Sequence, residues 1–131
     1  MGKVLALVDD LVFQSKLVET ARQVRVELKV FASGEQFVAE ALALTEAEPG
    51  QNSLTLLLVD LNTKQAPLDA IRRLRATGLK VPIVAFLSHV QVDLAEHARA
   101  AGCSEVLPRS TFAGNVAAIL SRAKSEGQQG L

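Results

Sequence analysis

Three aspartates in this sequence have the side chains and positions needed to bind a hard cation. Asp9 and Asp10 directly follow the apolar residues 4–8. Asp60 ends a longer, largely apolar run at residues 54–59. Each run has the length of a buried strand, and in open α/β folds ligands bind at the edge where the carboxyl ends of parallel strands meet. We therefore expect the three carboxylates to lie close together at one edge of a sheet.

Carboxylates held this close raise one another's pKa unless a cation lies between them. Mg²⁺ suits such a site because it takes oxygen ligands and prefers one or two carboxylates plus water and substrate oxygens. A carboxylate beside Mg²⁺ is also a competent acceptor for a phosphoryl group. Two other interpretations stay open at this point. The aspartates form a partly protonated or water-screened acidic cluster, or Asp60 simply ends its strand.

The elements that must position these aspartates alternate along the chain. Strands are expected at residues 3–10, 25–31, 54–60, 81–87 and 104–107. Helices are expected at residues 12–24, 33–42, 67–77, 92–101 and 110–123. This order predicts a three-layer, doubly wound, flavodoxin-like α/β domain with a five-stranded parallel sheet in the order 2-1-3-4-5. The second strand alternates apolar and charged residues, which fits the edge position that this order gives it.

Local signals mark the ends of several helices. Ser33 is an N-cap candidate, with Gln36 three residues on as a capping box requires. Pro67 suits the first position of a helix. Gly78 and Gly102 are expected to end the third and fourth helices.

Length, composition and charge limit the function classes. The 131 residues fit one domain, which we place at residues 1–126, followed by a flexible tail at 127–131. Fourteen basic and fourteen acidic residues cancel, which argues against a surface for nucleic acid or for anionic membranes. Cys103 is the single cysteine, as suits a reducing compartment. Neither a membrane span nor a signal-peptide pattern is found, so we expect a cytoplasmic location.

The motifs around the aspartates resemble the receiver domain of bacterial two-component response regulators, the CheY-like domains. Val-Asp-Asp at residues 8–10 matches the acidic pair of that family, and Leu-Val-Asp-Leu-Asn at 58–62 matches its phospho-acceptor strand. Residues 82–86 match its fourth strand and residues 101–107 the approach to its fifth. The resemblance covers nearly the whole chain.

The resemblance implies a signalling function in a two-component phosphorelay and no enzyme activity. Asp60 would accept a phosphoryl group from a histidine kinase or phosphotransfer protein and so change the binding of a downstream protein. Asp10 and Asp60 would bind Mg²⁺ by their side chains, Asn62 by its backbone carbonyl and Asp9 through water. The resemblance also allows a homodimer through the fourth helix, fifth strand and fifth helix.

The sequence departs from the family at the residues that respond to the phosphoryl group. Leu87 stands where the family has a Thr or Ser, and Ser88 follows one residue later on the opposite side of the strand. Pro-Arg-Ser at residues 108–110 replaces a Lys followed by a cis-Pro. Arg109 keeps the positive charge, and a guanidinium can bind phosphate through two hydrogen bonds. Val106 replaces the family's aromatic switch residue.

Two function classes therefore stay open. In a working receiver, Asp60 is phosphorylated with Mg²⁺ and partner affinity changes. In a pseudo-receiver, the same fold is a phosphorylation-independent interaction module. Losing the Thr hydroxyl removes a hydrogen bond worth about 1.5–3 kcal/mol, comparable to a typical coupling energy of about 1–3 kcal/mol.

A flavin-binding enzyme is a weaker third class, because the loop after the first strand has no phosphate cradle. His89, beside the expected pocket, is either a partly exposed loop residue or contacts a partner or the phosphoryl group.

Overall fold

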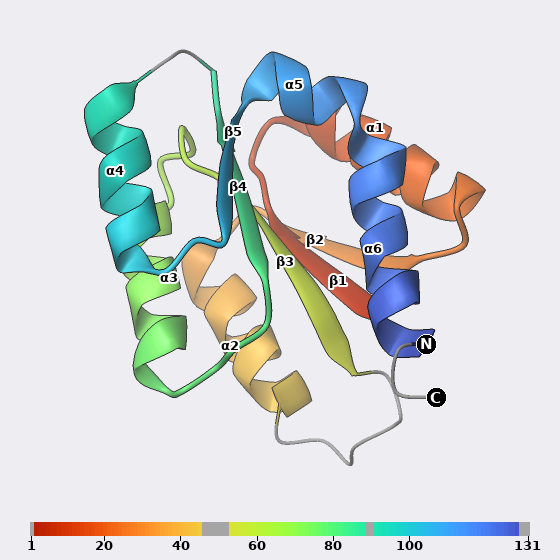
Figure 1. Ribbon diagram of the computed structural model, residues 1–131, viewed down its shortest axis with the longest axis horizontal. Coiled ribbons are helices and arrows are strands. Elements are labelled where there is room, and N and C mark those ends of the chain that lie inside the picture. The colour runs from red at the N-terminus through yellow and green to blue at the C-terminus, as the bar shows by residue number, and fades with distance from the viewer. Residues whose placement is uncertain (1, 46–52, 89–90, 129–131) are drawn as a thin grey trace.

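The computed structural model describes residues 2–45, 53–88 and 91–128, and its centre is a five-stranded sheet (Figure 1). The strands are β1 (Lys3–Leu7), β2 (Glu27–Phe31), β3 (Leu54–Asp60), β4 (Ile83–Leu87) and β5 (Glu105–Pro108). All neighbouring strands are parallel, in the order β2-β1-β3-β4-β5. The predicted strand order is therefore confirmed, with the alternating β2 at one edge.

Helices cover both faces of the sheet and give the predicted three layers. They are α1 (Leu11–Gln23), α2 (Gly34–Thr45), α3 (Pro67–Ala76), α4 (Val92–Ala101), α5 (Arg109–Gly114) and α6 (Val116–Gln128). One apolar core lies between the sheet and α2, α3 and α4. A second lies between the sheet and α1, α5 and α6. The central strands β1, β3 and β4 are buried on both faces, which explains their nearly continuous apolar sequences.

The predicted helix ends are confirmed. The Ser33 hydroxyl accepts a hydrogen bond from the Gln36 backbone N–H at 3.3 Å, as an N-cap does. Pro67 is the first residue of α3. Gly78 and Gly102 follow α3 and α4 with φ angles of 88° and 125°, which are in the region that favours glycine.

The single final helix expected at residues 110–123 is wrong, because the structure divides it into α5 and α6. The break is at Asn115, whose φ and ψ of −129° and 19° are not helical. Gly114 precedes it and is a poor helix former. The Asn115 side chain donates to the Thr111 carbonyl, which competes with regular helix hydrogen bonds. The division leaves α5 at the end of β5, over the carboxyl edge of the sheet.

The last helix, α6, continues as far as Gln128. Residues 129–131 lie outside the described residues, so the flexible tail at 127–131 and the domain limit at residue 126 stay predictions. Residues 46–52 and 89–90, which include His89, also lie outside. Within the part of the chain that is described, every helix is too short or too polar to cross a bilayer.

Candidate functional site

The three predicted aspartates meet at the carboxyl edge of the sheet. β1 and β3 are neighbours, with Leu7 opposite Val59, so the residues that follow β1 lie beside the end of β3. Asp60 is the last residue of β3 and is only 2% exposed. Asp9 and Asp10 are close enough for their negative charges to raise the pKa of Asp60. The expected convergence of carboxylates is therefore present.

Asp10 has two tasks at this edge. It is the N-cap of α1, where its Oδ1 accepts the Val12 and Phe13 backbone N–H groups at 3.0 and 3.1 Å. Its other oxygen, Oδ2, lies 2.9 Å from Nη2 of Arg109. The Phe13 hydrogen bond and the positive charge of Arg109 lower the pKa of Asp10, against the opposing effect of desolvation. Asp10 is therefore a carboxylate that the protein itself stabilises.

Asp60 is the buried member of the group. Its Oδ1 accepts the Asn62 backbone N–H at 2.9 Å, and its Oδ2 lies 3.6 Å from Nη1 of Arg109. Burial raises the pKa of Asp60, while the Asn62 hydrogen bond and Arg109 oppose that shift. The arginine therefore supplies positive charge where a buried carboxylate needs it.

Arg109 joins these two aspartates and is fixed by aromatic rings. It is the first residue of α5, directly after β5. Its guanidinium carbon lies 4.6 Å from the centroid of the Phe13 ring and 5.8 Å from that of Phe86. Only 26% of its side chain is exposed. One guanidinium thus contacts the carboxylates of Asp10 and Asp60 while it lies over a phenyl ring.

Thr63 is a residue of this site that the sequence interpretation missed. Its hydroxyl donates to Asp9 Oδ2 at 2.6 Å, and the Lys64 backbone N–H approaches the same oxygen at 3.4 Å. Thr63 is buried, although it lies in a loop. The one sequence signal for it is a hydroxyl side chain three residues after a strand-ending aspartate.

The Asn62 side chain contacts the connection between β4 and α4, while its backbone N–H donates to Asp60. Its side-chain oxygen accepts the Ser88 backbone N–H, and its Nδ2 donates to Gln91 Oε1 at 3.0 Å. Ser88 itself is exposed. Leu87 is 4% exposed and belongs to the apolar core on the α2, α3 and α4 side. The structure therefore does not bring Leu87 to the acidic pocket.

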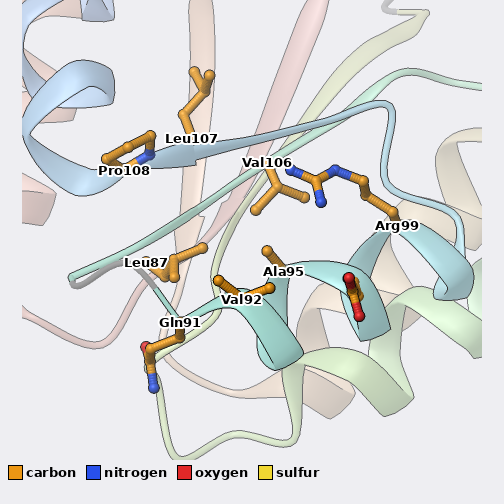
Figure 2. Close-up of a pocket in the computed structure, with 9 residues that line it drawn as sticks. Leu87, Gln91, Val92, Ala95, Arg99, Val106, Leu107 and Pro108 are labelled. Carbon is orange, nitrogen blue, oxygen red and sulfur yellow. The ribbon is translucent and has the colours of Figure 1, made fainter.

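Leu87 instead lines a groove between α4 and β5 with a volume of about 300 Å³ (Figure 2). The apolar residues along it come from both elements and from the end of β4: Leu87, Val92, Ala95, Val106, Leu107 and Pro108. The Leu107 side chain points away from the groove and packs against the core on the α1, α5 and α6 side. Val92 is 61% exposed, so the groove carries apolar surface open to solvent. Pro108, at its end, directly precedes Arg109.

The residues that the family resemblance assigns to Mg²⁺ do not fit a divalent cation in this arrangement. Among the described residues, no three Asp, Glu, His or Cys side chains are grouped so that they could hold a metal ion. Asp9 accepts from Thr63, and Asp10 and Asp60 both face Arg109. A guanidinium therefore lies between the two carboxylates expected to bind the ion.

The sequence matches no family model and no curated protein, but the structure matches solved receiver domains along nearly its whole length. A response regulator receiver domain protein from Clostridium thermocellum is 14% identical with a TM-score of 0.79, and all of both chains is covered. The chemotaxis response regulator CheY4 of Vibrio cholerae is 18% identical with a TM-score of 0.74, covering 94% of this chain and 98% of that chain.

A third similar structure is the receiver domain of the sensor histidine kinase PA1611 from Pseudomonas aeruginosa PAO1, with a magnesium ion coordinated in its active site cleft. It is 22% identical, with a TM-score of 0.73, and covers 94% of this chain and 97% of that chain. These similarities show that the chain has the receiver fold, and the predicted fold class is confirmed.

Proposed function

We propose that this chain is a pseudo-receiver: an interaction module of two-component signalling that binds its partners without being switched by phosphorylation. The observation that supports this most directly is the Arg109 guanidinium, which contacts both Asp10 and Asp60. The receiver fold supports a function in this signalling class. Its expected partners are a histidine kinase or phosphotransfer protein and a downstream protein.

Two further features support a module that does not respond to phosphate. First, a phosphoryl group on Asp60 would have to displace Arg109 or share it with Asp10, at a carboxylate that is almost fully buried. Second, β4 ends in the apolar side chain of Leu87, which packs in the core. The missing hydroxyl contact is worth about 1.5–3 kcal/mol, enough to remove most of a typical coupling between two sites.

A working receiver is the second candidate, and the same arginine favours it. Nη1 of Arg109 lies 3.6 Å from Asp60 Oδ2, so a cation is already placed where a phosphoryl group would add negative charge. A guanidinium binds phosphate oxygens through paired hydrogen bonds. In this alternative, Asp60 is the phospho-acceptor and Arg109 takes the part that a lysine has in the family.

Phosphodonor labelling separates the two candidates. The wild type and Asp60→Asn are incubated with acetyl phosphate and Mg²⁺ beside a receiver that is known to label, and intact masses are compared. We expect no phosphoryl adduct on the wild type while the known receiver is labelled. An adduct that forms on the wild type and is lost in Asp60→Asn would overturn the pseudo-receiver and establish the working receiver.

A further inference from the structure

We propose that Arg109 is the built-in cation of the acidic pocket, and that its guanidinium excludes divalent metal ions from a site that Asp10 and Asp60 would otherwise form. The inference rests on the proposed function and deepens it, because it concerns how the same pocket is regulated. It predicts that the wild-type domain is independent of Mg²⁺ and that loss of Arg109 creates a metal site.

Arg109 contacts the oxygen of each aspartate that accepts no backbone hydrogen bond. Nη2 lies 2.9 Å from Asp10 Oδ2, and Nη1 lies 3.6 Å from Asp60 Oδ2. The other oxygen of each side chain accepts backbone N–H groups, from Val12 and Phe13 for Asp10 and from Asn62 for Asp60. A cation that binds both aspartates through these oxygens would therefore compete with Arg109.

The third carboxylate, that of Asp9, is oriented by hydrogen bonds that do not involve Arg109. Asp9 Oδ2 accepts from the Thr63 hydroxyl at 2.6 Å and from the Lys64 backbone at 3.4 Å. These donors tie it to the loop after β3. The pocket thus carries three carboxylates and one guanidinium, and the guanidinium faces two of them. Removing the arginine leaves an uncompensated group of negative charges, which attracts a hard divalent cation.

Arg109 is held in place more firmly than an ordinary surface arginine. Its guanidinium lies over the Phe13 ring, which is itself buried between α1 and the sheet. Arg122, by comparison, pairs with Glu105 on an exposed part of α6, and 47% of its side chain is exposed. An arginine whose guanidinium lies over a ring and contacts two carboxylates loses less conformational freedom on binding them than a free one would. Arg122 is therefore a suitable control.

The test measures binding of Mn²⁺, used as the probe for a hard divalent cation, through loss of the free-ion signal in electron paramagnetic resonance. We compare the wild type, Arg109→Gln, Arg109→Ala and Arg122→Gln, each checked for folding by circular dichroism. Arg109→Gln keeps the aliphatic carbons and a neutral polar end but removes the guanidinium that lies over Phe13. Two Arg109 variants are used, so that the test can still be read if either Arg109→Gln or Arg109→Ala fails to fold.

We expect no specific binding to the wild type or to Arg122→Gln at millimolar Mn²⁺. The Arg109 variants should bind at least about tenfold more tightly, because a like charge a few ångströms away is removed. Adding Asp60→Asn to Arg109→Gln should abolish that binding. Equal binding by the wild type and the Arg109 variants would overturn the inference, and so would folded Arg109 variants that fail to bind.

The result is independent of the phosphodonor experiment. A wild type that takes a phosphoryl group but binds no Mn²⁺ would overturn the proposed function and leave the built-in cation standing. A wild type that binds Mn²⁺ at the pocket but takes no phosphoryl group would overturn the built-in cation and leave the proposed function standing.

Discussion

The Thr63 hydroxyl donates a hydrogen bond to Asp9 Oδ2 at 2.6 Å, joining residues that are 54 positions apart. Asp9 follows β1 and Thr63 follows β3, so this contact ties together the two loops that form the acidic edge. It also fixes the orientation of the Asp9 carboxylate in the pocket. The stability of the edge should therefore depend on a hydroxyl that belongs to no predicted motif.

Thr63→Val should lower the free energy of unfolding by about 1.5–3 kcal/mol, because a hydrogen bond to a charged group is lost while the side-chain volume is nearly kept. Urea unfolding measures the change. Thr111→Val on the exposed side of α5 is the control and should stay within about 0.5 kcal/mol of wild type. Equal stabilities for the two variants would show that the Asp9 contact contributes nothing.

Asp10→Ala should unfold at a lower temperature than Asp10→Asn. Both changes remove the carboxylate that pairs with Arg109, but asparagine can still accept the Val12 and Phe13 N–H groups as an N-cap. The difference between the variants in thermal unfolding therefore isolates the cap from the ion pair. Identical unfolding temperatures would mean that capping of α1 by this side chain does not stabilise the domain.

Gly102→Ala should destabilise the protein more than Gly78→Ala. Both glycines have positive φ, so each alanine costs about 1 kcal/mol of backbone strain. A Cβ at Gly78 would meet open space, whereas a Cβ at Gly102 would clash with Cγ of Arg75. Arg75 would have to move and weaken its hydrogen bonds to the Gly102 and Leu79 carbonyls. We expect a total loss of about 2–3 kcal/mol in chemical unfolding; losses of equal size would refute this packing argument.

Cys103 should react slowly with thiol reagents in the folded protein. Burial raises the pKa of its thiol to about 11, with Arg75 and Arg99 opposing the shift. Because the thiolate is the reactive form, alkylation by iodoacetamide at pH 8 should be about a hundredfold slower than in the urea-unfolded chain. Similar rates in the two states would contradict the raised pKa.

The same thiol predicts a loss of stability at high pH. Above its ordinary value of 9.0 the unfolded thiol ionises while the folded one keeps its proton, so the unfolded state is favoured as pH rises. Unfolding of the wild type and Cys103→Ala should be compared between pH 8 and pH 11, an interval set by these two pKa values. The wild type should lose more stability across it, and parallel curves would contradict the prediction.

The sheet and the meeting of the aspartates were predictable because they depend on local patterns. Apolar runs that end in Asp9, Asp10 and Asp60 define strands, and the alternation with helices restricts the strand order. The Arg109 contact with Asp10 was not predictable, since it joins residues 99 positions apart and depends on where α5 starts. The expected start at residue 110 is one residue after the observed start of α5 at Arg109, and the expectation of one continuous helix missed the break that follows. The break at Asn115 comes from a side-chain hydrogen bond that no periodicity reveals.

The ion pair between Arg109 and Asp10 also has a consequence for folding during synthesis. Synthesis proceeds from the N-terminus, so β1 and β3 emerge long before residue 109 leaves the ribosome. Until then, the carboxylates of these strands repel one another without the arginine that balances them. The acidic edge is therefore expected to be among the last parts of the nascent chain to acquire its final geometry.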